Sequence, residues 1–218
     1  QIFIQPAAGD AGGALGAALF AWHHYLDKSR SADGVNDSQR GSLLGPGYTD
    51  DEIERFLTAR GVPHKRLASQ ELYKTAAELL ARGRILGWFQ GRAEFGPRAL
   101  GARSILADPR RVDTQAALNL KIKFREGVRP FAPCVLQRYA SEWFEMRPGE
   151  ESPYMLMVAP VRESHRVPLS AEQERTLRED PDLIRRVNVP RSGVPAVTHV
   201  DYSARVQTID ERNGRLHR

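Results

Sequence analysis

The stretch GWFQGRAEFGPRALGARSILADPRRVDTQAALNLKIKFREGVRPFAP, from Gly87 to Pro133, decides how this chain is interpreted. Its cations lie between glycines and prolines, not along one face of a helix. From Arg84 to Pro130 there are ten Lys and Arg against four Asp and Glu, a net charge of +6, whereas the whole chain of 218 residues carries +5. Arginine forks match phosphate and carboxylate oxygens two at a time, and glycine lets backbone N–H groups approach such a ligand. The stretch therefore predicts a site for phosphate-like anions.

Three stretches resemble one family in the same order. They are QPAAGDAGGALGAA near the start, the Gly87–Pro133 stretch, and AVTHVDYSARVQTID near the other end. Together they resemble the NodU/CmcH-type O-carbamoyltransferases, and only a charged interval near Arg162 to Ser192 lies outside the likeness. The sequence departs from the family's pattern in ways that bear on acceptor specificity and not on fold or anion binding. The departures are Phe124, Val128, Tyr202 and Ser203.

The resemblance implies an α/β fold with two parts. Residues 1–46 would be the end of an actin-like (Kae1-like) domain, and residues 47–218 a truncated YrdC-like domain with an open twisted α/β sheet. The implied activity is transfer of a carbamoyl group from carbamoyl phosphate to a hydroxyl of a sugar or natural-product acceptor, through a carbamoyl-adenylate made with ATP. The resemblance implies a sugar of a nodulation factor or an antibiotic precursor as the acceptor, and the sequence does not choose between them. The implied cofactors are ATP and a divalent metal, Fe²⁺ by resemblance.

The anion-site candidates are cations and small polar residues, and Ser104 and Asn119 would hold a carbamoyl group or a ribose. Arg98, Lys121 and Arg125 are also catalytic candidates, because fixed cations stabilise the charge that spreads over oxygens during transfer. Glu94 is expected to orient Arg92 or Arg98. The predicted binding residues are Arg92, Gly96, Arg98, Arg103, Ser104, Asn119, Lys121, Lys123, Arg125, Arg129 and Arg205.

Lys121 and Lys123 cannot share a helix face, being two positions apart. If the helix predicted for ADPRRVDTQAALNLKI, with a cap near Asp113, ends by Asn119, the two lysines would share one side of a strand.

His199 is a fourth catalytic candidate. PAVTHV and ARVQTID are predicted strands of a hairpin with its turn at Asp201 to Ser203. His199 and Asp201 alternate on the first and Arg205 and Gln207 on the second, so all four would face one side. A lone strand histidine is more often structural, whereas the resemblance makes a place at the pocket rim credible.

Asp10 lies in the glycine turn before an apolar helix that runs from Ala14 onward. A carboxylate there is typical of a helix cap. The resemblance instead makes Asp10 one ligand of a metal site whose two histidines would precede Gln1. His23 and His24 point about 100° apart on a helix and cannot hold one ion together, so surface positions are expected. This fragment alone is therefore expected not to complete carbamoyl transfer.

Other elements follow from local signals. Gln1–Gln5, RILGWFQG and YMLMVAP are predicted strands, and the interval from Arg162 to Ser192 is predicted to be a solvated excursion without catalytic residues. TDDEIERFLTARG begins with a Thr49–Glu52 capping box, and SQELYKTAAELLARG begins at Ser69. The predicted core faces of these two helices are Ile53, Phe56 and Leu57, and Leu72, Ala76, Leu79 and Leu80, with stops at Gly61 and Gly83.

Composition excludes several classes. No apolar run approaches the ~20 residues of a membrane span, and no signal peptide is present. The single cysteine, Cys134, forms no internal disulfide, which fits a reducing, cytoplasmic compartment. Nucleic acid is disfavoured because the positive excess sits in one interval without interleaved aromatic residues. Oligomeric state leaves no sign in the sequence.

Two rival functions stay open. One is a tRNA-modifying carbamoyl-adenylate enzyme, which would bind tRNA. The other is a non-catalytic anion- or RNA-binding module, which would show steeply salt-dependent binding to unrelated RNAs.

Overall fold

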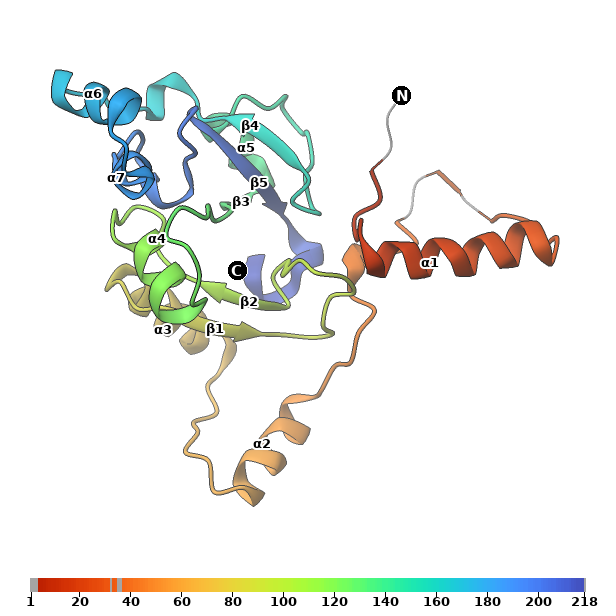
Figure 1. The fold of residues 1–218 in the computed structure, drawn as a ribbon. Helices are drawn as coiled ribbons and strands as arrows, with labels where there is room; N and C mark the ends of the chain where they lie inside the picture. The colour runs from red at the N-terminus through yellow and green to blue at the C-terminus, as the bar shows by residue number, and fades with distance from the viewer. Residues whose placement is uncertain (1–3, 32, 35–36, 218) are drawn as a thin grey trace.

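The computed structural model describes residues 4–31, 33–34 and 37–217, and these form a mixed α/β fold (Figure 1). The helices are α1 (Asp10–Phe20), α2 (Asp50–Ala59), α3 (Ser69–Ala81), α4 (Thr114–Ala117), α5 (Gln137–Trp143), α6 (Ala171–Glu179) and α7 (Leu183–Asn188). The strands are β1 (Leu86–Phe89), β2 (Arg103–Leu106), β3 (Cys134–Leu136), β4 (Met157–Pro160) and β5 (Ser203–Ile209). Wider π-type turns extend α1 over Ala21–Tyr25 and α4 over Leu118–Ile122. Short 3-10 turns lie at Arg40–Ser42, Glu163–His165, Pro195–Val197 and Glu211–His217.

The strands form two small sheets in the part of the chain that is described. β1 and β2 pair antiparallel, with Leu86 opposite Leu106. In the other sheet β5 is central, parallel to β3 and antiparallel to β4. The predicted α/β class is confirmed. The described strands pair as a two-stranded and a three-stranded sheet instead of the open twisted sheet that was expected, because Pro109, Gly127, Pro130 and Pro133 interrupt the chain between β2 and β3.

The hydrophobic core lies around β5, where every residue except Arg205 is buried. Burying apolar side chains on both sides of one strand removes their surface from water and fixes that strand at the centre of its sheet. The packed cluster consists of Ala140, Phe144, Met146, Ala159, Val161, Ala204 and Val206. Arg205 therefore projects from a buried strand at the centre of its sheet.

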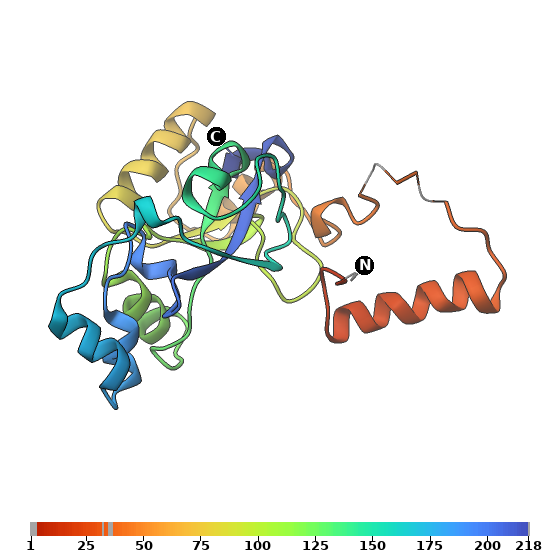
Figure 2. The ribbon, with the colours of Figure 1, turned by 90° about the horizontal axis from the view of Figure 1, so that it is seen from above.

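Helices α1 and α2 stand away from this core. Figures 1 and 2 both show α1 extending from the rest of the molecule, and it buries none of its residues. On α2 the predicted core face is wrong for the described residues, because Ile53 is 38% and Phe56 is 58% exposed. On α3 the predicted face is confirmed, since its apolar residues are half-buried and the helix contacts β1.

The predicted helix ends are largely confirmed. Thr49 and Glu52 make both hydrogen bonds of the capping box of α2. Gly61 and Gly83 follow α2 and α3 with positive φ angles of 65° and 76°, which glycine adopts without steric cost. α3 differs in that Ala68, not Ser69, occupies the cap position.

Several predicted strands are corrected. The segment PAVTHV is a 3-10 turn at Pro195–Val197, because Pro195 favours the first helical position and the Thr198 hydroxyl donates to the Val194 carbonyl. The chain still turns back before β5, where His199 N donates to the Ser203 carbonyl at 2.7 Å. At the N-terminus, residues 1–3 lie outside the described residues, and Ile4 and Gln5 are not in a strand.

The charged interval from Arg162 to Ser192 is more ordered than predicted. It contains α6 and α7, and α6 begins with a capping box between Ser170 and Gln173. Arg191 in this interval is only 1% exposed. A buried arginine without apolar periodicity around it leaves no signal in the sequence, which is why the packing was missed. No helix of the described residues is long and apolar enough to cross a membrane.

Candidate functional site

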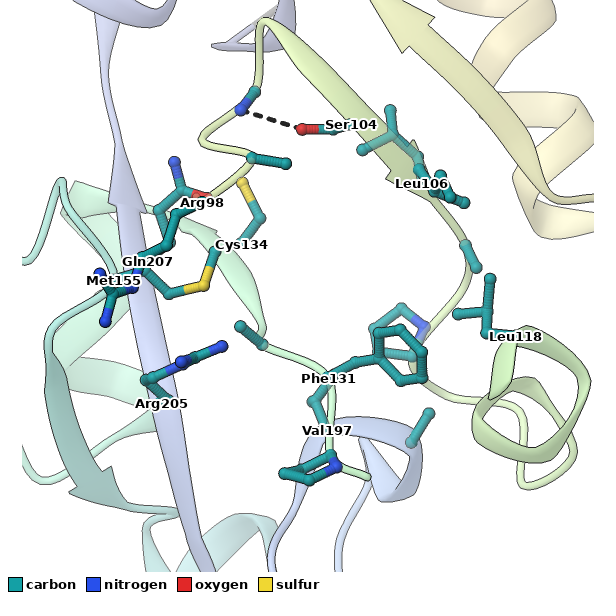
Figure 3. A pocket seen from close by; sticks show the side chains of 18 of the residues that line it. Arg98, Ser104, Leu106, Leu118, Phe131, Cys134, Met155, Val197, Arg205 and Gln207 are labelled. Atoms are coloured by element: carbon teal, nitrogen blue, oxygen red, sulfur yellow. Dashed lines mark hydrogen bonds between the residues drawn. The ribbon is translucent and has the colours of Figure 1, made fainter. Parts of the chain in front are cut away.

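A cavity of about 530 Å³ lies between the two sheets (Figure 3). Figure 3 shows Arg98, Arg205 and Gln207 on one side and Leu106 and Leu118 on the other. Its volume falls in the usual range for small-molecule pockets. The walls come from β2, β5, the turn after α4, and the loops around residues 97–101 and 130–134.

The charged residues that line this cavity are all cations. They are Arg98, Lys123, Arg125 and Arg205. Among the described lining residues there is no Asp or Glu. Four positive groups without carboxylates would repel one another, so the cavity favours a ligand with several negative charges.

Arg98 and Arg205 form the centre of this positive region. Arg98 Nη1 donates to the Pro6 carbonyl at 3.0 Å, while its Nε is buried without a partner in the described structure. Burial and then the charge of Arg98 lower the pKa of Arg205. Neither guanidinium has an ion-pair partner among the described residues. Both are therefore available to an anion.

The loop that carries Arg98 is held from inside by Glu94. The Glu94 side chain is fully buried, and its Oε1 accepts hydrogen bonds from the backbone N–H groups of Leu100 at 2.6 Å and Ala102 at 2.8 Å. Its Oε2 lies 3.2 Å from Nε of Arg103. Glu94 thus pairs with Arg103, and the expectation that it orients Arg92 or Arg98 directly is corrected. The backbone N–H groups come close enough because the loop folds around the carboxylate, which spacing alone does not reveal.

Asn119 supports the second part of the positive region. It is completely buried, and its Nδ2 donates to the carbonyls of Gly127 at 3.3 Å and Arg129 at 2.9 Å. Its Oδ1 accepts from Nε of Arg125 at 2.8 Å, and Arg125 also lies over the ring of Phe131. In this geometry Asn119 orients Arg125 and has no surface left for a carbamoyl group or a ribose.

Ser104 lines the cavity, and its hydroxyl oxygen accepts a hydrogen bond from Gly101 N at 3.0 Å. Four other predicted binding residues lie outside the cavity lining: Arg92, Gly96, Arg103 and Arg129. Arg92 donates to the Leu44 carbonyl, and Arg129 lies near Glu126. Gly96 accepts from Arg103 Nη2 through its carbonyl at 2.6 Å.

Lys121 and Lys123 do not share a strand, because the helical turn continues to Ile122. Only Lys123 lines the cavity.

His199 lies in the turn before β5 and is not among the lining residues. Its Nδ1 is 2.9 Å from Ser203 Oγ, which donates to Asp201 at 2.7 Å. Burial lowers the pKa of His199. These contacts stabilise the turn, and a catalytic role for His199 stays a prediction.

Asp10 begins α1 and is exposed, and Gly9, which has no side chain, occupies the cap position before it. No group of three or more His, Cys, Asp or Glu residues gathers around it or elsewhere in the described residues. His23 is half-buried and His24 exposed, as expected for surface positions. The described residues alone therefore do not make a metal site, and Asp10 as a ligand stays a prediction.

Sequence reasoning missed part of the cavity wall. Gln207 is buried on β5 and donates to the Leu100 carbonyl at 2.8 Å, which ties the central sheet to the Arg98 loop. Cys134 and Met155 also line the cavity. The alternation of Arg205 and Gln207 was the one sequence signal that pointed here.

Cys134 provides a direct test of the cavity's environment. The Cys134 side chain is exposed where it lines the cavity, but the protein atoms that surround the cavity desolvate the thiol and raise its pKa to about 12, so the reactive thiolate is scarce near neutral pH. We expect iodoacetamide to alkylate Cys134 at least about a hundredfold more slowly than free cysteine at pH 8 to 9. Mass spectrometry of timed samples measures this. Denaturing the protein in urea restores the rate of a free thiol, and equal rates in the native protein would contradict the described surroundings.

The class that fold and site define is a mixed α/β protein with a cavity whose charged lining residues, among those described, are all cations. The sequence pattern of the carbamoyltransferase C-terminus matches residues 77–218. The chain is 51% identical to the uncharacterized protein sll1178 of Synechocystis sp., over 96% of this chain and 33% of that protein. It is 42% identical to nodulation protein NolNO of Sinorhizobium fredii, over 96% of this chain and 27% of that protein. It is 36% identical to 3'-hydroxymethylcephem-O-carbamoyltransferase of Amycolatopsis lactamdurans, over 100% of this chain and 34% of that protein.

The chain belongs to the carbamoyltransferase C-terminus family, and the predicted resemblance is confirmed. It spans about a third of the length of these curated relatives.

Proposed function

We propose that this chain is the donor-binding part of an O-carbamoyltransferase, in which the cavity between the two sheets binds ATP and carbamoyl phosphate. The observation that carries the proposal is the lining of four cations without a carboxylate among the described residues. The family relationship supports carbamoyl transfer, since a relative bears the name 3'-hydroxymethylcephem-O-carbamoyltransferase. The finer proposal is a YrdC-like domain that forms a carbamoyl-adenylate, preceded by the end of a Kae1-like domain.

In this proposal the cations act on charge that develops during transfer. Arg98 and Arg205 would hold phosphate oxygens from one wall, while Lys123 and Arg125 would approach from the turn after α4. Preorganised donors of this kind stabilise a transition state without reorganising at the moment of reaction. Asn119 contributes by fixing the Arg125 guanidinium through its Oδ1.

The acceptor would be a hydroxyl-bearing sugar or natural product. Its hydroxyl oxygen would attack the carbamoyl carbon, the bond from that carbon to the phosphate oxygen would break, and the hydroxyl proton would pass to a base. A metal, with Fe²⁺ suggested by resemblance, would need ligands beyond Asp10, because no group of three or more His, Cys, Asp or Glu residues is found in the described part of the chain.

Replacing Arg98 or Arg205 by alanine is expected to weaken ATP binding by about tenfold or more, because a hydrogen bond to a charged group contributes ~1.5–3 kcal/mol. Isothermal titration calorimetry with ATP and with carbamoyl phosphate measures the affinities. Arg92→Ala is the matched control: Arg92 lies on the same basic stretch but bonds to the Leu44 carbonyl outside the cavity. The control is expected to bind within about twofold of the parent protein.

Two outcomes would contradict the proposal. If neither ATP nor carbamoyl phosphate binds while unrelated RNAs bind with a steep dependence on salt, the chain is an anion- or RNA-binding module. If tRNA binds selectively together with ATP, the tRNA-modifying alternative replaces the O-carbamoyltransferase.

A further inference from the structure

The loop that carries Arg98 is in direct contact with the segment that leads into α1. Ala7 is 1% exposed, and a Cβ atom placed on Gly96 would lie 2.8 Å from the Cβ of Ala7. Arg98 donates to the Pro6 carbonyl at 3.0 Å, and Ala8 lines the cavity. Gly96 has a φ of 100°, which permits this close approach of the two backbones. The loop that forms this wall of the cavity therefore packs directly against the segment before α1.

One backbone hydrogen bond closes this segment on itself, and a second connects it to the first turn of α1. Ala8 N donates to the Gln5 carbonyl at 3.0 Å, and Gly12 N donates to the Ala7 carbonyl at 2.9 Å. Gly12 has no room for a side chain, because a Cβ atom there would lie 2.6 Å from the Ala7 oxygen. A movement of Pro6–Ala8 must consequently move the first turn of α1, where Asp10 lies.

Arg98 is subject to two opposing influences. The Pro6 carbonyl attracts its guanidinium, while the like charge of Arg205 lies on the same side of the cavity in Figure 3. Its Nε is buried without a partner in the described structure. An anion near both arginines would cancel their repulsion and engage N–H groups of Arg98 that the Pro6 carbonyl does not use.

We propose that Arg98 is a positioning residue as well as an anion ligand: an anion in the cavity holds the Arg98 guanidinium against the Pro6 carbonyl and thereby fixes Pro6–Ala8 and the first turn of α1. This inference rests on the proposed function, because it requires an anion in the cavity. The coupling is reciprocal, so that an ordered first turn of α1 also raises the affinity for the anion. Binding of an anion in the cavity thus changes the order of the segment that carries Asp10.

Amide hydrogen exchange followed by NMR tests this, with inorganic phosphate as the probe. At saturating phosphate we expect the amides of Ala8 and Gly12 to exchange about fivefold more slowly, the low end of typical coupling between sites. Chemical-shift changes at Ser104 and Gln207 in the same spectra report whether phosphate enters the cavity. If phosphate shifts these signals and exchange at Gly12 is unchanged, the coupling is refuted while the proposed function stands. If phosphate causes no shift there at any concentration, the proposed function itself fails.

Matched variants locate the coupling. Arg98→Gln, studied at phosphate concentrations that saturate it through the remaining cations, is expected to abolish the phosphate effect on Gly12. Arg92→Gln removes a guanidinium that also donates to a backbone carbonyl but lies outside the cavity, and it is expected to keep the full effect. A phosphate effect that persists in Arg98→Gln would overturn the proposal.

A second variant tests the segment without changing a charge. Gly96→Ala would place its methyl group against Ala7, and we expect faster exchange at Gly12 in the absence of phosphate. Unchanged exchange at Gly12 in a folded Gly96→Ala protein would contradict the contact on which the coupling depends.

Discussion

Replacing Arg191 by methionine is expected to lower the free energy of unfolding by roughly 3–5 kcal/mol. The side chain is 1% exposed and donates to four backbone carbonyls at 3.0 to 3.1 Å, in the last turn of α7 and at Thr198 and His199. Methionine fills similar space but donates nothing, so buried carbonyls would be left without partners. Urea denaturation followed by circular dichroism measures the loss.

The control for this prediction is Arg185→Met on α7, the helix whose last carbonyls Arg191 contacts. Its side chain is 73% exposed and lies 3.8 Å from Asp180 and Asp182, so its removal is expected to change stability by no more than about 0.5 kcal/mol. If Arg191→Met proves as stable as the parent protein, the four hydrogen bonds do not hold α7 to the turn before β5.

The second large effect is expected at Glu94. Glu94→Ala is predicted to cost about 2–4 kcal/mol and to abolish anion binding, because the N–H groups of Leu100 and Ala102 lose their acceptor and the Arg98 loop loses its internal support. Glu94→Gln keeps one carbonyl oxygen as an acceptor for these N–H groups. This variant is therefore expected to retain part of the stability and part of the anion binding. Thermal unfolding and phosphate titration of the same samples separate stability from binding.

Glu71→Ala serves as the matched carboxylate control. Glu71 is half exposed and pairs with Lys65 at the surface, so its loss is expected to leave stability and phosphate binding within the error of measurement. An alanine variant of Glu94 that stays fully stable would mean that the loop is held by other contacts.

The comparison of sequence and structure separates local signals from tertiary ones. The Thr49–Glu52 capping box and the glycine after α3 were predictable because the hydrogen bonds and backbone angles involved lie within a few residues. The 3-10 turn at Pro195–Val197 was missed because a β-branched run favours a strand, whereas Pro195 and the Thr198 hydroxyl favour a local turn.

The predicted anion-site residues fall only partly in the cavity lining. The charge excess between glycines led to Arg98, Ser104, Lys123 and Arg125, and the predicted hairpin led to Arg205, and all five line the cavity. The predicted cations that do not line the cavity are Arg92, Arg103, Lys121 and Arg129. They were included because the sequence alone does not distinguish one cation of a basic stretch from another. Whether a given arginine faces a cavity, a carboxylate or a carbonyl depends on neighbours far away along the chain.

The family, the α/β class and the positive charge of the cavity lining follow from residue types and their order alone. In contrast, tertiary contacts make Glu94 and Asn119 buried supports, hold Arg191 among carbonyls and bring Arg98 to Pro6. A polar side chain becomes buried and hydrogen-bonded when segments distant in the sequence meet, as Arg98 and Pro6 do, and a linear pattern contains no information about which segments meet.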